Sequence, residues 1–363
     1  MLQNSASEAE VPRAQDEESM GNCCRRALWW SCYSLAWVVT LTLGIVAVER
    51  VFNHDGIHLL TWLNAFTRYV YLPAYACLAW AVWQRRWLLA IASCLVVSCH
   101  LYWMAPDFLR DRRFDLPATT IDSSQPSETI RIFFANVAGG NHEFDAMLNE
   151  IAEANPDVIV LVEYNWQWHK AFRVSSLIAA YKFGTGHMRP RDGSATVFSR
   201  IPLAKSEVEW IEGRGIETSE LHVGEQLLRI VGLHAPRPMH GRSYNYDGYW
   251  RAAMPKLKNM PGATVIVGDF NATEHSLVYQ QLKDARYRSA HDDRGRGYAT
   301  TWPNGKFLLP PIRIDQAMIS PEIECVNIAE GVGKGSDHKP LVLDVRIRNQ
   351  GLIQAIPTAR SDS

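Results

Sequence analysis

The sequence predicts an α/β protein in which N-terminal transmembrane helices precede a two-sheet α/β sandwich with outer helices. Two observations carry this prediction. Long uncharged runs rich in Trp, Leu, Val and Ala occur before about residue 110, whereas charged residues, Pro and Gly are frequent after it. Beyond residue 129, segments with strand and helix periodicity are joined both by helices and by hairpin-like turns, a mixture that favours helices packed outside two sheets.

The composition excludes several function classes. The 37 Lys and Arg residues balance 38 Asp and Glu residues, so bulk electrostatic binding of nucleic acid is not expected, although a local basic groove is compatible with this balance. Six of the seven cysteines precede residue 100, which excludes a disulfide scaffold for the C-terminal two thirds. The absence of GxxxxGK[ST] and GxGxxG motifs removes nucleotide-cofactor folds that use those loops.

A membrane region is expected over residues 27–106, with about three transmembrane helices at 27–48, 59–83 and 87–105. The first run carries no charge and, at 1.5 Å per residue, is long enough to cross a hydrocarbon core of about 30 Å. The second contains Asn64 and Arg68 and is the least apolar of the three. A cleaved signal peptide and a soluble all-α domain are the alternatives. They are disfavoured because no small-residue cleavage site follows the first run and the runs are apolar all round.

The arginine distribution predicts the orientation of these spans. Arginine pairs at 25–26 and 85–86 lie on one side if all three segments cross, and their cytoplasmic placement puts everything after residue 106 outside the cytoplasm. The chain is therefore expected to be a multi-pass protein of the plasma (inner) membrane whose catalytic domain is extracytoplasmic. Arginines within 110–113 argue for the opposite side, and loss of the second span would invert the domain.

The remaining boundaries follow from composition. Residues 1–26 show no apolar period and are expected to be a mobile tail, residues 107–128 are rich in Pro, Ser and Thr and are expected to be a linker, and residues 347–363 form a second tail. The domain between them covers 129–346. Its expected helices are His142–Ala154 and Tyr244–Leu257, and its expected strands are 130–137, 158–162, 196–199, 206–211, 217–223, 226–233, 264–267, 312–319 and 341–345.

Polar residues gather at the ends of these strands. They are Asn136, Glu163, His234, Asp269, Asn271, Asp315, Asp337 and His338. Each alone is an ordinary turn or surface residue, but strand ends of one sheet can meet at one edge. Carboxylate and amide oxygens are the ligands that Mg²⁺ prefers, whereas no HExxH or CxxC cluster indicates zinc. Asp, His and Asn can also supply the base and the donors that phosphoryl transfer needs.

The motifs FANV, LVEY, GLH, GDFNA, RIDQ and SDHKP, in this order over residues 129–345, resemble the endonuclease/exonuclease/phosphatase superfamily. The ATTWP and PPIRID segments at 299–303 and 310–315 are similar to those of its membrane-anchored bacterial members. The resemblance implies a deoxyribonuclease I-like fold. The metal ligands that it implies are Glu163, Asn136 and Asp337, with Mg²⁺ as the cofactor and Mn²⁺ as the alternative ion. The catalytic residues that it implies are Asp269, Asn271, His338, His234 and Asp315.

The resemblance also implies a role for each catalytic residue. Asp269 would orient or deprotonate the attacking water, and Asn271 would contact the phosphate. His338 would bind or protonate a phosphoryl oxygen while Asp315 fixes its tautomer. The remaining histidine, at 234, matches the second histidine of the nuclease and sphingomyelinase branches, and Asp192 is a candidate partner for it. One departure is Ala138, where several members carry an acidic or amide residue.

The substrate is less determined than the reaction. The loop 235–251 interleaves arginines with aromatic residues, which suits base stacking, lipid head groups or simple packing of the loop against the domain. The expected function is a membrane-tethered, divalent-metal-dependent phosphoesterase that hydrolyses phosphodiester bonds, with a nuclease favoured. A phospholipid or small-phosphoester phosphodiesterase or phosphatase is the alternative, followed by a non-catalytic phosphate-binding module. The expected partners are a phosphate ester, from nucleic acid or a phospholipid head group, and membrane lipid; no protein partner is implied.

Overall fold

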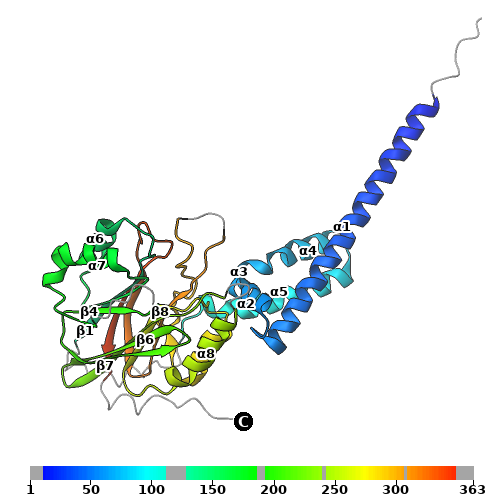
Figure 1. Cartoon of the computed structure of the whole chain (residues 1–363). Coiled ribbons are helices and arrows are strands. Elements are labelled where there is room, and N and C mark those ends of the chain that lie inside the picture. The colour runs from blue at the N-terminus through cyan, green and yellow to red at the C-terminus, as the bar shows by residue number, and fades with distance from the viewer. Residues whose placement is uncertain (1–10, 112–127, 186–192, 239–242, 306–308, 349–363) are drawn as a thin grey trace, which may run out of the picture. The chain divides into compact units, whose positions relative to one another are not determined.

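The computed structural model describes residues 11–111, 128–185, 193–238, 243–305 and 309–348 (Figure 1). The chain divides into two compact units. The helical unit consists of residues 1–52 and 68–101, and the α/β unit consists of residues 53–67 and 102–363. The second unit is therefore discontinuous in sequence, because it includes a short segment from within the expected membrane region.

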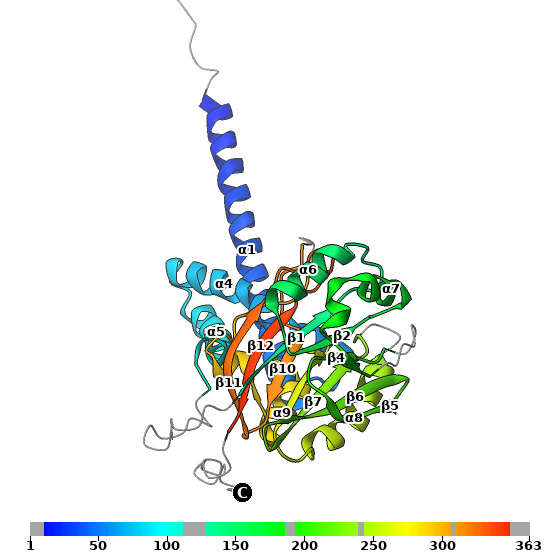
Figure 2. The ribbon, with the colours of Figure 1, turned by 90° about the vertical axis from the view of Figure 1, so that its left-hand side faces the viewer.

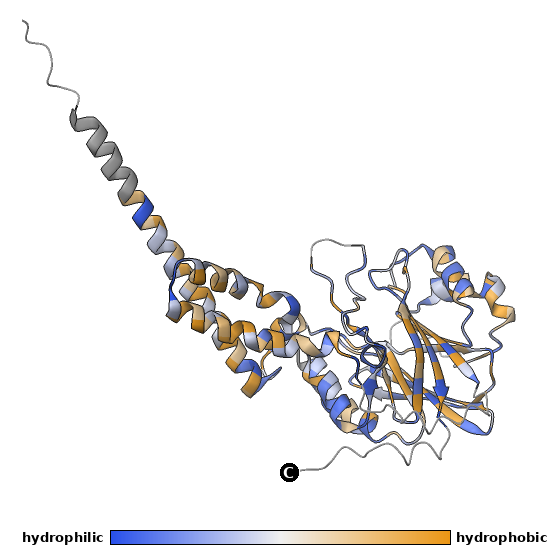
Figure 3. Ribbon diagram, turned by 180° about the vertical axis from the view of Figure 1, so that it is seen from behind, coloured by the Kyte–Doolittle hydropathy of each residue, from blue (hydrophilic) through white to orange (hydrophobic). Residues whose placement is uncertain are grey.

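Two helices of the described chain are long and apolar enough to cross a membrane. They are the part of α1 (Val11–Asn53) from Cys23 onward and all of α5 (Trp87–Phe108). Figure 3 shows the largely hydrophobic colouring of both. The side chains of Thr40 in α1 and Ser93 in α5 share a hydrogen bond of 3.0 Å. The helix α4 (Leu72–Trp83) packs in the same unit but has only 12 residues.

The expected single span 59–83 is not a single helix. It is divided into α2 (His58–Ala65), α3 (Thr67–Val70) and α4. Asn64, whose amide donates to the carbonyl of His54 and to the Asp55 carboxylate, draws the chain into a compact turn. Pro73 in the first turn of α4 then starts a separate helix. The helix α2 belongs to the α/β unit and not to the helical unit.

Two other expected boundaries also differ. The chain is helical from Val11 and not only after residue 26, because Ala, Gln, Glu and Met in 14–20 are good helix formers attached to a long apolar helix. Pro106 does not end α5, which continues to Phe108. The described start of the expected linker packs on the α/β unit, since the amide of Asp111 donates to the carbonyl of Asp292 at 2.9 Å. The other linker residues and the C-terminal tail lie outside the described residues.

The α/β unit contains two six-stranded sheets (Figure 2). The first has the order β11-β12-β1-β2-β4-β3 and the second β5-β6-β7-β8-β10-β9. The strands of the first sheet are β1 Thr129–Asn136, β2 Val158–Val162, β3 Phe183–Gly184, β4 Thr196–Ser199, β11 Ile323–Glu330 and β12 Leu341–Ile347. Those of the second sheet are β5 Leu203–Ile211, β6 Arg214–Val223, β7 Gln226–His234, β8 Thr264–Asp269, β9 Arg288–Ser289 and β10 Asp315–Ile319. The β1/β2 and β7/β8 pairs are parallel and the other pairs are antiparallel, so both sheets are mixed.

The core lies between the sheets. Side chains at alternate positions of β1, including Ile132 and Phe134, pack with Val265 and Val267 of β8 in one buried cluster. Helices α6 (Phe144–Ala154) and α7 (Trp166–Val174) cover the outer face of the first sheet, and α8 (Ser243–Lys258) and α9 (Leu277–Ala285) cover that of the second. This arrangement confirms the predicted two-sheet sandwich with outer helices.

Candidate active site

The first part of the site comes from the parallel pair β1 and β2. Their register places Asn136 beside Val162, so Asn136 and the following Glu163 leave the sheet at the same edge. Glu163 has φ of 55°, a left-handed conformation that turns its carboxylate back toward the chain after β1. Its Oε2 accepts from the Gly139 amide at 3.0 Å, and its Oε1 accepts from Asn136 Nδ2 at 3.2 Å.

Glu163 is held ionised by its surroundings. Burial by itself would raise its pKa, but the Gly139 amide, His234, Asn136 and Arg237 together lower the pKa of Glu163 below its usual value. The Arg237 guanidinium lies 3.3 Å from Oε1, and His234 Nε2 lies 3.8 Å from the same oxygen. The donors of Asn136 and His234 and the cation of Arg237 therefore converge on Oε1 of the partly exposed Glu163 side chain.

The second part of the site comes from the other sheet. The parallel register of β7 and β8 pairs His234 with Asp269, and the antiparallel register of β8 and β10 pairs Asp269 with Asp315. Asn136 Nδ2 also donates to Asp269 Oδ2 at 3.0 Å. This single amide group bridges Glu163 of one sheet and Asp269 of the other, so the edges of both sheets meet in one site.

Asp269 is completely buried. Its Oδ1 accepts from the backbone amide of Asn271 at 2.9 Å, and its Oδ2 lies 3.6 Å from His234 Nε2. Burial, with the neighbouring Asp315 charge, raises the pKa of Asp269 despite the opposing effect of two histidines. A carboxylate with a raised pKa is a stronger base, which suits it to accept a proton from water.

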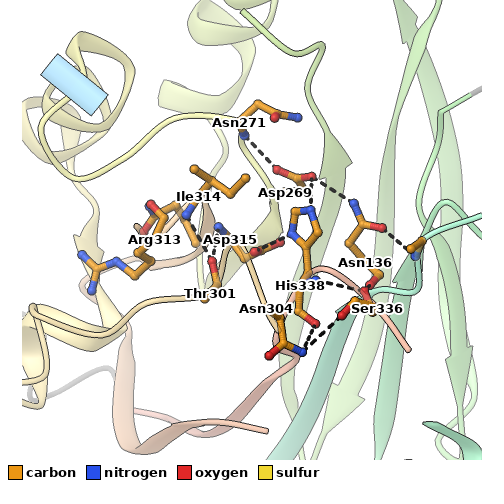
Figure 4. Close-up of polar contacts among 12 residues, drawn as sticks. Asn136, Asp269, Asn271, Thr301, Asn304, Arg313, Ile314, Asp315, Ser336 and His338 are labelled. Carbon is orange, nitrogen blue, oxygen red and sulfur yellow. Dashed lines mark hydrogen bonds and ion pairs between the residues drawn. The ribbon is translucent and has the colours of Figure 1, made fainter. Parts of the chain in front are cut away.

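His338 and Asp315 form a buried pair. His338 Nδ1 donates to Asp315 Oδ2 at 2.9 Å, and Nε2 lies 3.8 Å from Asp269 Oδ2 (Figure 4). The Thr301 hydroxyl accepts from the backbone amide of Asp315 at 3.1 Å and fixes the start of β10. Burial alone would lower the pKa of His338, but the Asp315 and Asp269 carboxylates raise it to about 9. The imidazole is therefore a proton donor at neutral pH.

The loop that carries Asp337 and His338 is anchored on both sides. Ser336 Oγ donates to the carbonyl of Asn136 at 2.7 Å, and the Asn304 side chain donates to carbonyls at 332, 333 and 336 (Figure 4). The anchored loop places Asp337 beside His338 and Asn271 in the lining of one pocket.

The environment of His234 fixes its tautomer. Arg214 Nη1 lies 3.4 Å from Nδ1, and because a guanidinium can only donate, Nδ1 accepts and the proton sits on Nε2. Burial is the main cause that lowers the pKa of His234, and the Arg214 charge adds to it. A neutral ring thus points an N–H group toward Glu163 and Asp269. The suggested partner Asp192 lies outside the described residues.

All eight residues selected from the sequence lie around one site, but several contributors were missed. They are the Gly139 amide, Arg214, Thr301, Asn304 and Ser336. Only the Gly139-Gly140 pair gave a signal, since glycines permit a close approach of backbone to a carboxylate. At the departure noted above, the Ala138 amide donates to Asn136 Oδ1 at 2.9 Å, so this position acts through its backbone.

The donor set fits a hard divalent cation. Glu163, Asn136 and Asp337 offer carboxylate and amide oxygens, and the Glu163 side chain is one quarter exposed, so a ligand can reach this carboxylate. Asn136 directs Nδ2 toward both carboxylates, so its oxygen would have to turn toward Glu163 to join the ligand set. Asp269, Asp315 and His338 also bring three ligand atoms within 4.8 Å, but the bond between His338 and Asp315 fits a proton relay better.

Buried acid and base groups thus lie beside a partly exposed carboxylate on a two-sheet sandwich of the deoxyribonuclease I-like fold. The sequence pattern of the endonuclease/exonuclease/phosphatase family matches residues 133–338, and the chain belongs to this family. Members of the family are hydrolases that act on phosphoesters with the help of divalent metal ions. A search among curated proteins found no match.

Solved structures share the fold. TDP2 from D. rerio, in complex with a single-strand DNA product, is 17% identical, with 60% of this chain and 99% of that chain covered and a TM-score of 0.51. TDP2 from C. elegans is 14% identical, with 60% and 75% covered and a TM-score of 0.50. Sphingomyelinase C from Streptomyces griseocarneus is 18% identical, with 61% and 100% covered and a TM-score of 0.45. At these identities the likeness to the two TDP2 structures establishes the fold alone.

Proposed function

We propose that this protein is a membrane-tethered, divalent-metal-dependent phosphoesterase that hydrolyses phosphodiester bonds. The observation that carries the proposal is the buried array in which Asp269 Oδ2 lies 3.6 Å from His234 Nε2 and 3.8 Å from His338 Nε2, while His338 Nδ1 is bonded to Asp315 at 2.9 Å. Such an array can remove a proton from water at one atom and supply protons at two others. A module that only bound phosphate would not need a buried base.

Glu163, Asn136 and Asp337 would hold Mg²⁺, with Mn²⁺ as the alternative ion. When bound, the ion would neutralise charge on the phosphoryl group. Asp269 would accept the proton of the attacking water at Oδ2, the oxygen that already faces Asn136 and both histidines. The buried position of this oxygen keeps bulk water from competing with the reacting molecule.

The two histidines would donate to the phosphoryl oxygens. Nε2 of His338 carries the proton that is transferred. The Nδ1 proton stays on the ring and is donated in a hydrogen bond to Asp315, whose charge stabilises the charged ring. Nε2 of His234 would hold a second oxygen without changing its charge, because Arg214 fixes the neutral tautomer. The Asn271 side chain lines the same pocket and would contact the phosphate.

The tether would consist of α1 and α5. Residues 53–67 follow α1, residues 102–111 include the end of α5, and both segments belong to the α/β unit. If both helices cross, the arginine pairs at 25–26 and 85–86 lie on the opposite side. Cytoplasmic placement of these pairs would put the α/β unit on the extracytoplasmic face of the plasma (inner) membrane, and residues 68–86 would return the chain to the cytoplasmic side.

Hydrolysis assays on the full chain in detergent test the proposal. The esters are DNA, RNA, a phospholipid and an aryl phosphodiester, each with Mg²⁺, with Mn²⁺ and with chelator. We expect metal-dependent cleavage that is lost in His338→Ala and in Asp269→Asn, while Asp269→Asn still binds the ester. Binding without turnover in the wild-type protein would instead identify a phosphate-binding module. The ester that is cleaved best distinguishes a nuclease, which the sequence favours, from a lipid phosphodiesterase.

A further inference from the structure

The helix α2 is part of the α/β unit although it lies outside the matched family region. His58 Nε2 and Trp62 Nε1 both donate to the carbonyl of Pro238, at 2.9 and 2.7 Å. The segment is also held at its start, where Asp55 Oδ2 accepts from the Leu277 amide at 2.6 Å. These contacts fasten a helix of eight residues beside the loop that follows His234.

An apolar pocket separates α2 from the catalytic residues. Its volume is about 230 Å³, and its lining includes Trp62 from α2 and Phe66 directly after that helix, Trp302 and Ile312 from the facing segment, and Asn271 and His338 at the catalytic end. The rings of Trp62 and Phe66 stack at 6.1 Å with an angle of 5°, which makes one flat wall. An apolar cavity of about 150 Å³ is large enough for benzene, so this pocket has room for an apolar group of comparable or somewhat larger size.

We propose that α2 forms a specificity subsite that takes the glyceride end of a membrane phospholipid, with the first carbons of an acyl chain between Trp62 and Trp302. This inference rests on the proposed function and names its substrate. The pocket opens directly onto His338, so the group that it holds lies beside the proton donor. A ligand seated there is therefore the leaving alcohol of the phosphodiester.

The step balances as a hydrolysis. The oxygen of water forms a bond to phosphorus as its proton passes to Asp269, and the bond between phosphorus and the glyceride oxygen breaks. His338 gives its Nε2 proton to that oxygen. The products are a diacylglycerol and the phosphorylated head group, and proton transfer through solvent restores both side chains.

Three observations favour a lipid over a nucleobase in this pocket. Trp62 Nε1 is already bonded to the Pro238 carbonyl, so the aromatic wall has no spare donor for a base edge there. The formal net charge of −1 offers no general attraction for a polyanion. Only residues 54–57 separate the end of α1 from the start of α2, so a helix apolar enough to cross a membrane directly precedes the subsite in the sequence.

A series of phospholipids with increasing acyl length tests the inference. The full chain is assayed in a maltoside detergent at one fixed concentration. The substrates are glycerophosphodiesters with the same head group, from the deacylated ester to the dihexanoyl ester, and single-stranded DNA is tested beside them. We expect kcat/KM to rise by about fourfold for each methylene that enters the pocket and then to level off, because burying one methylene group contributes about 0.8 kcal/mol. The expected product is the diacylglycerol.

Two variants at the end of α2 and one matched control locate the effect. Phe66→Ala, at the residue after the helix, removes half of the flat wall, and Ala65→Trp fills the pocket from the last helical position. Both should lower kcat/KM for the dihexanoyl ester by about tenfold or more, while cleavage of the deacylated ester stays within about twofold. Trp210→Ala on β5, which removes an exposed aromatic ring, should change neither substrate.

The outcomes separate the two proposals. Wild-type protein that cleaves none of the esters refutes the proposed function, and the lipid inference with it. Cleavage that does not depend on acyl length, or that responds equally to Phe66→Ala for acylated and deacylated esters, refutes the lipid subsite alone. A loss confined to DNA cleavage would assign the pocket to a base and would also overturn the inference.

Discussion

The Asp55 carboxylate accepts a hydrogen bond from the backbone amide of Leu277, 222 residues further along the chain, at 2.6 Å. Leu277 is the first residue of α9, and the side chain of its N-cap residue, Ser276, makes no capping bond. Asp55 therefore satisfies an amide that the helix itself leaves without a partner, and its charge lies at the favourable end of the helix dipole. The segment before α2 thus completes a helix of the hydrolase domain.

Asp55→Ala should loosen both helices. The substitution removes the acceptor for the Leu277 amide and for the Asn64 side chain, and the loss of a capping side chain typically costs about 1 kcal/mol. We expect faster hydrogen exchange of the peptide that contains Leu277, measured by mass spectrometry on the full chain. Asp55→Asn keeps one acceptor oxygen and should show a smaller effect. Unchanged exchange in Asp55→Ala would mean that α9 does not depend on this contact.

Asp315→Asn should impair catalysis with little effect on substrate binding. An amide at this position cannot stabilise the charged imidazole of His338, and loss of an orienting or proton-transferring group typically lowers kcat by 10²–10⁴-fold, so we expect a fall of about that order. Steady-state kinetics would show the change in kcat with KM nearly constant. Asp284→Asn, on the exposed end of α9, is the matched control and should behave as wild type. A change in KM alone would remove the relay role from Asp315.

Glu163→Gln should weaken metal binding. The substitution removes the charge of the proposed principal ligand but keeps an oxygen at the same position, so the affinity for Mn²⁺ should fall by about tenfold or more. Calorimetric titration of the full chain measures this without turnover. Glu153→Gln on the exposed face of α6 carries the same change in charge and should bind as wild type. Equal affinity of both variants would place the ion elsewhere.

Glu217 should make stability depend on pH. Burial raises its pKa to about 7 despite donors from Ser206 and Ser219, and its Oε2 has no hydrogen-bond partner. The folded protein therefore keeps a proton that the unfolded chain releases above pH 4.5, so the free energy of unfolding falls as pH rises from about 5 to 8. The loss approaches about 2–3 kcal/mol.

Glu217→Gln should remove this loss. Denaturation of the full chain at pH 5 and pH 8 would then show a loss of stability that is smaller than in the wild-type protein by about 2–3 kcal/mol, and the variant would exceed the wild-type protein at pH 8. The exposed Glu225→Gln is the control for the change in net charge. The same pH dependence in Glu217→Gln and wild type would assign the effect to another group.

The sandwich and the catalytic set were readable from local patterns. The buried runs of β2 and β8 are short and rich in β-branched residues, and an acidic residue comes directly after β2 and ends β8, so Glu163 and Asp269 could be placed at strand ends. Strand β11 was missed because a bulge between Cys325 and Asn327 interrupts its alternation. The helices α7 and α9 were missed because their polar faces are long and no acidic residue marks the first turn.

The supporting contacts were not readable, because they join residues far apart in sequence. Nothing near Arg214 indicates that its guanidinium selects the tautomer of His234, and the hydropathy of 59–83 hides a helix that packs on the hydrolase domain. Asn64 and Arg68 were the one local sign that this segment differs from its neighbours. Side chains that act through tertiary contacts leave no periodic signal.

The bond between α2 and Pro238 also sets an order of assembly. The two partners are 180 residues apart, and at a synthesis rate of 5–20 residues per second the ribosome takes about 10–40 s to deliver the second after the first. During that interval α2 lacks its partner surface, while α1 and α5, if they span a membrane as proposed, can already enter it. The helix that borders the pocket is therefore made early but fixed in place only after β7 has formed.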